Sequence, residues 1–480
     1  MDNRSHYDLV IVGTGFASSF FLHRFLQKNK SARKILVLER GSLNSHAWQI
    51  ENNRNSSQSS SHTFIRKGIE NKDWYFTIGF GGSSNCWTGC TPRMLPSDFR
   101  LKSTYGVGYD WPVTYDELEP FYSEVETIMS ISGPDDWTLS HRSKDFPQPP
   151  HNLSAPDKVL RSAYPGLYYA QATARARVAT KNRAACCASA QCSLCPINAK
   201  FTILNEMQHL YEDKRVELQL NAEVESLSLG SDTAKSISVR QNDVLFSVSA
   251  DLFVLGANGI FNPAILKRSG DTHMLVGKRL HEQVATVVTM DLNGLDNFQG
   301  STFIPGQGYM FYDGEHRRTH GACMTESLNM LSLLRPDLGR WRQRMGMVFI
   351  VEDIPLDENR VDIDSQGKPI VVYEKYSAYG LAGLAKVPSY IEQLGKYLPI
   401  EQVYYSESFK NQLPRSSEAH IQGTVVMGRD PATSVIDERL IHHRYRNLLV
   451  LGSSAFPTGA PANPTITLSA LSLMAADRVS

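Results

Sequence analysis

The stretch YDLVIVGTGFAS, residues 7–18, decides the fold. Its apolar run at 9–12 is typical of a buried strand, and it passes directly into a G-x-G-x-x-S turn that begins at Gly13. A helix is expected at 19–29 and a second strand at 34–38. The order strand, glycine turn, helix, strand predicts a βαβ unit with a dinucleotide at the turn.

Each position of that turn has a physical role. Gly13 permits the tight bend, Gly15 lets a pyrophosphate approach the backbone, and Ser18 is the small residue that helix packing requires. The free N–H groups of the helix N-terminus then face the phosphates. Glu39 ends the second strand, where an acid can accept hydrogen bonds from ribose hydroxyls. A dinucleotide site is therefore favoured over an accidental βαβ unit, and both FAD and NAD fit these residues.

Composition narrows the classes of partner. The chain has 480 residues, which is long enough for two domains, and it carries 49 basic and 49 acidic side chains with no Lys/Arg block. This balance does not favour binding of nucleic acid, and a small, roughly neutral substrate is expected. No apolar run is long enough for a membrane span, and no cleavable signal is visible at the N-terminus. The cytoplasm is the expected location, with export alongside a signal-bearing partner left open.

The middle of the chain mixes helical and strand patterns. Thr114 and Glu117 form a capping box, which predicts a helix to about Ile128. The run 252–257 is typical of a buried parallel strand entering a turn, and 466–479 has helical spacing. Further strands are predicted at 216–220, 224–229, 236–240, 245–249 and 447–451.

A series of motifs in the tail decides the cofactor. They are HIQGT from His420, Asp437, NLLVLG at 447–452, Pro457-Thr458 and NPTIT at 463–467. This tail resembles the C-terminal signature of the glucose-methanol-choline (GMC) oxidoreductases. Other marks of that family stand upstream in order: GGSSNCW at 81–87, DWP at 110–112, Gly256-Ala257 with Pro263, Leu266, Ser269 and Gly270, and GKRL at 277–280. The resemblance spans nearly the whole chain and implies FAD.

The resemblance also implies an architecture. The expected fold class is α/β, with a Rossmann-like FAD-binding domain and an inserted α+β substrate domain on an antiparallel sheet. The FAD-binding domain is expected to be discontinuous, at 1–100, 190–282 and 416–480, with the substrate domain and connectors at 101–189 and 283–415. The residues expected to bind the cofactor are Gly13, Gly15, Ser18, Glu39, Gly82, Ser83, Ser84, Asn85, Cys86, Val224, Gly256, Gly452, Asn463, Pro464 and Thr465.

The reaction expected from the resemblance is oxidation of a primary or secondary hydroxyl to the carbonyl, with hydride passing to flavin N5. Such a reaction needs a base with a pKa near neutral for the hydroxyl proton, and the resemblance assigns His420 as that base and Asn463 as the neutral group that hydrogen-bonds the same oxygen. A lone histidine would more often be structural, but here the HxxGT and NPxxT motifs flank the site. His281, His442 and His443 lack such support and are interpreted as structural or surface residues.

Two details favour a sugar, an aminosugar or another small polar alcohol. Gly452 and the string 88–93 are more similar to pyranose oxidase than to the commoner family members. In pyranose oxidase the residue before the motif tryptophan is a histidine bonded to the flavin, whereas here it is Cys86. Histidyl attachment is therefore excluded at this position, and a free thiol or a cysteinyl bond remains.

A cysteine-rich segment suggests a second redox group. Cys186, Cys187, Cys192 and Cys195 stand close together, and Cys195 precedes a proline. This segment resembles the iron-sulfur segment of the FAD glucose dehydrogenase catalytic subunit, which spaces its last two cysteines one residue further apart. An iron-sulfur cluster, a zinc ion and metal-free thiols are the alternatives.

The cluster matters for the electron acceptor. With a cluster, the protein would be a dehydrogenase that passes single electrons to an acceptor protein or a quinone. Without one, an oxidase that produces hydrogen peroxide gains weight. A third hypothesis, from another class, is a flavoprotein electron-transfer subunit without alcohol chemistry, and the presence of both His420 and Asn463 speaks against it.

Overall fold

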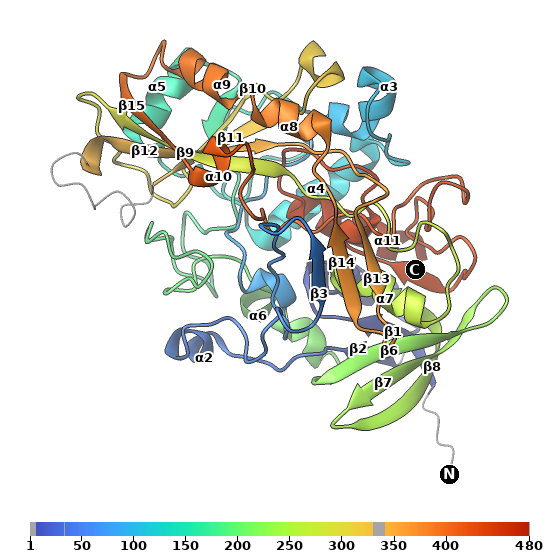
Figure 1. Cartoon of the computed structure of the whole chain (residues 1–480). Helices are drawn as coiled ribbons and strands as arrows, with labels where there is room; N and C mark the ends of the chain where they lie inside the picture. The colour runs from blue at the N-terminus through green and yellow to red at the C-terminus, as the bar shows by residue number, and fades with distance from the viewer. Residues whose placement is uncertain (1–5, 33, 330–340, 480) are drawn as a thin grey trace.

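The computed structural model describes residues 6–32, 34–329 and 341–479. Its strands form three sheets, and Figure 1 shows the largest of them at the bottom of the molecule and a second sheet at the top. The largest sheet has the order β5-β2-β1-β8-β7-β6, with β16 paired to β8. Its strands are β1 (His6–Val12), β2 (Ile35–Leu38), β5 (Val216–Gln219), β6 (Ala222–Leu229), β7 (Ala234–Gln241), β8 (Val244–Leu255) and β16 (Leu448–Val450).

Strand β8 joins two kinds of pairing. The sequence predicted separate strands at 245–249 and 252–257, but the structure has one twelve-residue strand. Its first half pairs antiparallel with β7, and its second half pairs parallel with β1 and β16. The exposed Asp251 between the halves does not break the strand, because the ladders on either side of it are continuous. The buried parallel half confirms the pattern seen in the sequence.

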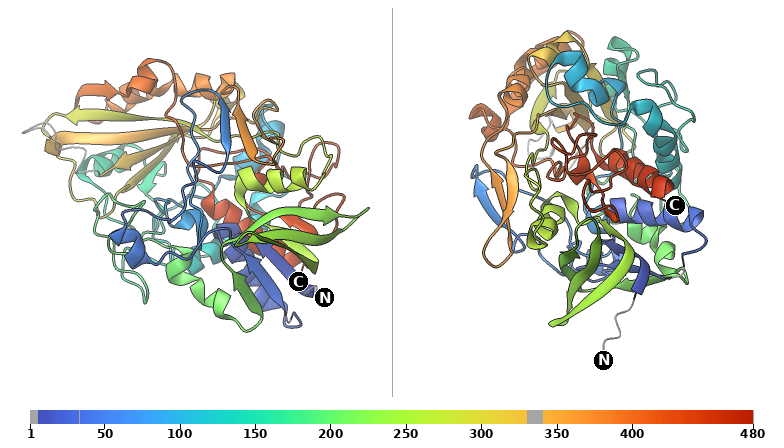
Figure 2. Two further views of the ribbon diagram at one scale, coloured as in Figure 1. Left: turned by 60° about the horizontal axis from the view of Figure 1, so that its bottom comes forward. Right: turned by 90° about the vertical axis from the view of Figure 1, so that its right-hand side faces the viewer.

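Helix α1 (Phe16–Lys28) begins directly after the glycine turn, three residues before the expected start. Gly15 is its N-cap residue and offers no side chain to the free N–H groups. Because the helix begins at Phe16, Ser18 lies inside its first turn. Helix α1 packs against α11 (Thr465–Val479), which also contacts α4 (Tyr115–Met129). Figure 2 shows α1 in blue beside α11 in red. The capping box of Thr114 and Glu117 is confirmed at the start of α4.

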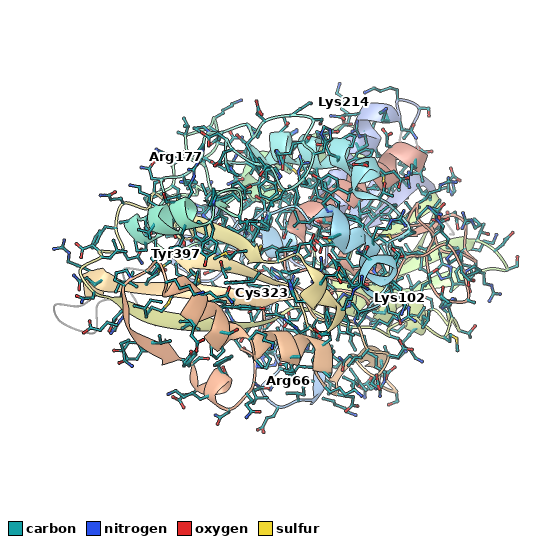
Figure 3. All side chains as sticks on the ribbon, turned by 90° about the horizontal axis from the view of Figure 1, so that it is seen from above. Arg66, Lys102, Arg177, Lys214, Cys323 and Tyr397 are labelled. Carbon is teal, nitrogen blue, oxygen red and sulfur yellow. The ribbon has the colours of Figure 1, made fainter. Side chains whose placement is uncertain are left out.

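The second sheet is antiparallel throughout, with the order β15-β9-β12-β11-β10-β4. It confirms the predicted fold class, a Rossmann-like sheet combined with a domain on an antiparallel sheet. Cys323 lies within this sheet and is fully buried (Figure 3). The strands are β4 (Tyr168–Ala170), β9 (Val284–Leu292), β10 (Gly306–Phe311), β11 (Cys323–Leu328), β12 (Arg344–Val351) and β15 (Ile400–Tyr405).

A third, small sheet links distant parts of the chain. Strand β3 (Ile65–Gly68) pairs parallel with β14 (Pro369–Tyr373), which pairs antiparallel with β13 (Arg360–Ile363). Segments that the sequence assigned to different domains therefore share hydrogen bonds. The remaining helices are α2 (His46–Glu51), α3 (Leu101–Tyr105), α5 (Ala155–Ala163), α6 (Ile203–Glu206), α7 (Asn258–Arg268), α8 (Ala378–Leu384), α9 (Val387–Leu394) and α10 (Glu407–Lys410).

Each large sheet has its own hydrophobic core. One buried cluster covers the parallel strands and helices α1 and α11, and another lies beneath the antiparallel sheet. Short 3-10 helices occur at Gly82–Ser84, Pro96–Arg100, Gln208–Glu212, Glu315–Arg318, Trp341–Gln343 and Ser453–Ala455. Among the described residues, no helix is both long and apolar enough to cross a membrane.

Candidate active site

A cavity lies where four parallel strands end. Strands β1, β2, β8 and β16 run in the same direction, and the residues just beyond their carboxyl ends line the cavity. These are Gly13, Glu39, Gly256 and Gly452. Ligands of open α/β sheets bind outside the carboxyl ends of the strands, so the cavity occupies the expected position.

The glycine turn leaves room for a dinucleotide. Gly13 has a φ of +88°, and a Cβ atom there would lie 2.8 Å from the carbonyl oxygen of Gly256. A Cβ on Gly256 would lie 2.0 Å from Ser18 Oγ, which shows how closely the helix approaches the sheet. Gly15 differs, because a Cβ there would meet no protein atom within 4 Å. A methyl group would instead fill the space beside the helix N-terminus, so this turn fits a pyrophosphate.

Glu39 fixes the same turn. Its Oε2 accepts hydrogen bonds from the backbone N–H and the hydroxyl of Thr14 at 3.1 and 2.7 Å, and its Oε1 accepts one from the Gly41 N–H at 2.9 Å. Burial raises the pKa of Glu39, against these hydrogen bonds. Sequence reasoning missed Thr14. It also missed Arg40 and Glu223, an ion pair at 3.3 Å that lines the cavity beside Glu39.

Most residues expected to bind the cofactor line this cavity. They are Gly13, Gly15, Glu39, Gly82, Ser83, Cys86, Val224, Gly256, Gly452, Asn463, Pro464 and Thr465. Three others lie behind the lining. Ser18 donates to the Val12 carbonyl oxygen, Ser84 to that of Gly81, and Asn85 to that of Phe80. In the structure these three side chains support the loops.

His420 and Asn463 meet at the cavity wall. The distance from His420 Nε2 to Asn463 Nδ2 is 3.4 Å, and both residues line the cavity although 43 positions separate them. Asn463 Oδ1 is buried and has no hydrogen-bond partner among the described residues. Burial, together with the charges of Arg415 and Lys72, lowers the pKa of His420 to about 3, well below the near-neutral value expected of the base. The imidazole is therefore neutral at physiological pH and can accept a proton.

A buried ion pair holds the His420 loop. Glu282 Oε2 accepts hydrogen bonds from the His420 N–H and the Ser417 hydroxyl, both at 3.2 Å, and Oε1 accepts the Glu418 N–H at 3.3 Å. The Lys72 ammonium pairs with the same carboxylate, and both side chains are 1% exposed. Sequence reasoning missed this pair. The available signal was the position of Glu282 just after the family string 277–280.

The other histidines do not line the cavity. His281 is buried, and its Nδ1 lies 2.8 Å from the Arg279 carbonyl oxygen. His442 Nε2 contacts Asp271 Oδ2 at 2.9 Å, and His443 Nε2 contacts Ser434 Oγ at 2.9 Å. Each contact is with a neighbouring loop or turn, as expected for structural residues.

The cysteine segment lies against the loop 82–88. The Lys200 ammonium donates to the carbonyl oxygens of Asn85, Trp87 and Ser193, and so ties the two segments together. Cys187 is exposed, Cys192 is buried, and Cys186 and Cys195 are half-buried. Nowhere in the described ranges do three His, Cys, Asp or Glu side chains converge closely enough to hold a metal ion. The thiols as placed do not fit a cluster or a zinc ion.

Two buried cations accompany this segment. Lys200 is 3% exposed, and Arg175, whose guanidinium contacts Cys90 Sγ at 3.8 Å, is 1% exposed. Within the described part of the chain, neither has a carboxylate oxygen within 4.0 Å. Burial lowers the pKa of Lys200 to about 8, and Cys192 is among the cysteines that oppose this shift and that raise the pKa of Arg175. Neutral acceptors hold both cations, among them the Thr302 hydroxyl and the Gln171 side-chain oxygen for Arg175, so an anion or a thiolate nearby would stabilise them further.

Comparison with known proteins places this geometry in a class of flavin-dependent enzymes. A family model described as GMC oxidoreductase matches residues 384–472, the segment that carries His420 and Asn463. The large subunit of fructose dehydrogenase from Gluconobacter japonicus is 23% identical over 98% of this chain and 97% of its own length. Paromamine 6'-oxidase from Streptomyces fradiae is 25% identical over all of this chain and 92% of its own length.

A solved structure has the same overall fold. The crystal structure of pyridoxine 4-oxidase from Mesorbium loti superposes with a TM-score of 0.69 at 17% identity, covering 98% of this chain and 99% of that one. The chain is similar to GMC-type dehydrogenases and oxidases over nearly its whole length, and its C-terminal segment matches the GMC oxidoreductase family model. It is an FAD-dependent enzyme that oxidises alcohol groups.

Proposed function

We propose that this enzyme oxidises a primary or secondary hydroxyl of a sugar, an aminosugar or another polar alcohol to the carbonyl. The contact between His420 and Asn463 at the wall of the dinucleotide cavity carries the proposal. Two relatives support the substrate class, since their names assign fructose and paromamine to them. The polar side chains of Thr88 and Glu418 line the same cavity and suit a hydroxylated substrate.

We propose that the residues lining the cavity bind the cofactor. The turn from Gly13 to Gly15 would hold the pyrophosphate, Glu39 the ribose, and the loop with Cys86 together with the residues 463–465 the flavin end. FAD, when bound, supplies the acceptor for the hydride. We further propose that 1–100, 190–282 and 416–480 form the FAD-binding domain, and that 101–189 and 283–415 form the substrate domain and connectors.

The protein's own part of the chemistry is proton transfer and orientation. Loss of hydride from a carbinol carbon requires removal of the hydroxyl proton, and neutral His420 Nε2 can take it. Asn463 lies next to Nε2 and would hydrogen-bond the substrate oxygen, which fixes that oxygen and stabilises its developing negative charge. The resulting imidazolium would be costly in this buried site, so the proton is expected to leave before the next turnover.

The proposal has two forms, which differ in the electron acceptor. The leading form is a dehydrogenase with a protein or quinone acceptor, and the alternative is an oxidase that forms hydrogen peroxide. An iron-sulfur cluster on Cys186, Cys187, Cys192 and Cys195 stays a prediction of the sequence. The described thiols do not converge on a common point, which does not support a route for electrons through this segment.

One purification tests these alternatives. The protein is isolated without oxygen, and its absorption spectrum is recorded with iron and acid-labile sulfide per flavin. Flavin with several iron and sulfide atoms, and dye reduction without oxygen uptake, supports the dehydrogenase. Flavin without iron, with oxygen uptake on addition of sugar, supports the oxidase. Flavin that stays in the supernatant after acid precipitation identifies Cys86 as a free thiol, and absence of flavin contradicts the proposal.

A non-catalytic electron-transfer subunit is the remaining hypothesis. It would have no use for a neutral buried histidine next to an asparagine at the cavity. A bound flavin that dithionite reduces but that no alcohol reduces would favour this hypothesis.

A further inference from the structure

Gln283 is buried between the two residues proposed to act on the substrate. It directly precedes strand β9 and is 3% exposed. Its Oε1 lies 3.1 Å from His420 Nδ1. Its Nε2 donates to the carbonyl oxygens of Ala460 at 2.7 Å and Ala462 at 3.1 Å.

The two carbonyls fix the orientation of the amide. A backbone carbonyl oxygen only accepts hydrogen bonds, so the NH₂ group of Gln283 must face Ala460 and Ala462. The flipped amide would place Oε1 against two other oxygens and leave both carbonyls without this donor. Gln422 Nε2, which donates to Gln283 Oε1 at 3.3 Å, favours the same orientation.

This orientation determines which ring nitrogen of His420 carries the proton. Gln283 Oε1 can only accept, so Nδ1 must be the N–H donor. A neutral imidazole has a single N–H, and Nε2 therefore keeps its lone pair. Nε2 is the nitrogen that faces Asn463. The base is thus prepared on the side of the ring that meets the cavity.

The Gln283 amide also fixes the backbone next to Asn463. Ala462 is the residue before Asn463, and its carbonyl oxygen is held by Gln283. One side chain therefore connects the His420 ring with the backbone that carries Asn463. A shift of Gln283 would change the proton position and the spacing of the pair together.

We propose that Gln283 is a positioning residue that selects the His420 tautomer with a free Nε2 and sets the spacing between His420 and Asn463. This inference rests on the proposed function of His420. A neutral amide suits the task because it accepts the Nδ1–H without adding a negative charge. A carboxylate at the same place would stabilise the imidazolium, so that Nε2 would be protonated at acidic pH and could not act as a base.

Several charged groups surround the His420 loop. Arg415 and Lys72 disfavour the imidazolium, whereas Glu282 binds the His420 N–H and Glu418 lies two residues before the ring. Lys72 and Glu282 pair with each other, and Arg415 Nε lies 3.1 Å from Glu418 Oε1. All four remain in place when residue 283 is changed, so a shift in the pH profile can be assigned to position 283.

The test uses the FAD-loaded enzyme and three variants: Gln283→Glu, Gln283→Met and, as a control, Gln148→Met. Gln148 is also buried, but it binds the backbone N–H groups of Arg177 and Val178 and does not line the cavity. The rate of anaerobic flavin reduction by substrate is measured from pH 3.5 to 9, together with flavin content and melting temperature at each pH.

We expect the rate in Gln283→Met to fall by roughly 10- to 100-fold at every pH, since both the tautomer and the spacing are lost. In Gln283→Glu, the acid limb of the profile should move up by about one pH unit or more, with most of the rate kept at high pH. Gln148→Met should keep the wild-type profile. A wild-type rate in Gln283→Met, or the same unshifted profile in both variants, would overturn the proposal.

A second measurement does not depend on turnover. In protein labelled with ¹⁵N-histidine, the His420 signals are assigned by their loss in a His420→Gln variant. The expected result is a protonated Nδ1 and an unprotonated Nε2 in the wild type, and a mixture of tautomers in Gln283→Met. A protonated Nε2 in the wild type contradicts the proposal. The expected tautomer in a protein that no alcohol reduces would instead contradict only the proposed function.

Discussion

The His420 loop lines the dinucleotide cavity, whereas the cysteine segment lies outside its lining, and the two regions differ in whether their buried cations are paired with a carboxylate. Around His420, the backbone and the ring have buried partners in Glu282 and Gln283. Beside the cysteines, two buried cations lack carboxylate partners within the described residues, and one thiol is exposed. The buried lysine of the first region is therefore already paired, whereas the second region would gain most from an added negative charge.

The largest expected effect follows from removal of the base. In His420→Ala, the rate of flavin reduction by substrate should fall by roughly 10²- to 10⁴-fold, because no other group replaces Nε2. FAD content should stay the same. Stopped-flow reduction without oxygen measures the rate, and His62→Ala, a change at an exposed histidine, is the matched control. A rate within about threefold of the wild type would show that His420 is not the base.

Gly15→Ala tests whether the cavity holds a dinucleotide. The added Cβ meets no protein atom within 4 Å, so folding and melting temperature of the apoprotein should be unchanged. Affinity for FAD should fall roughly tenfold or more, because the methyl group occupies the path of the pyrophosphate. Gly395→Ala, at an exposed helix end with ordinary contacts, is the control. Equal FAD affinity in Gly15→Ala and the wild type would contradict this placement of the cofactor.

The parallel core was largely predictable, because Gly13, Gly15 and the apolar run before them restrict the local conformations to few alternatives. The start of α1 and the continuity of β8 were not, since both depend on pairing with distant strands. His420 and Asn463 could be proposed from their motifs. Gln283 could not, because its role arises from three segments that only the fold brings together.

Cys192→Ser tests the independence of the two regions. Cys192 does not line the cavity, so flavin reduction by substrate should remain within about twofold of the wild type. Reoxidation of the flavin by a dye or by oxygen is measured separately, with Cys323→Ser in the antiparallel sheet as a buried-cysteine control. Slower flavin reduction in Cys192→Ser alone would show that the cysteine segment acts on the proton-transfer site.

The smallest effect concerns pH. The pKa of His420 is lowered from 6.5 to about 3 by burial, so the ring stays neutral in the folded protein well below pH 6.5. Flavin reduction in the wild type should therefore lose less than about twofold between pH 8 and 5 through this group. Below pH 6.5 the ring takes up a proton in the unfolded chain but not in the folded protein. Through this group, the free energy of unfolding therefore falls progressively as the pH drops from 6.5 toward 3. An acid limb near pH 6.5 that disappears in His420→Ala would contradict the assigned environment.

Anaerobic reduction of the bound flavin tests the central claim most directly. The purified, FAD-loaded protein is mixed with sugars, aminosugars and small polyols, and the flavin absorbance and the carbonyl product are followed. At least one of these compounds should bleach the flavin and yield one carbonyl per flavin reduced. A flavin that dithionite reduces but that no alcohol in the series reduces would contradict the claim that this protein oxidises a polar hydroxyl group.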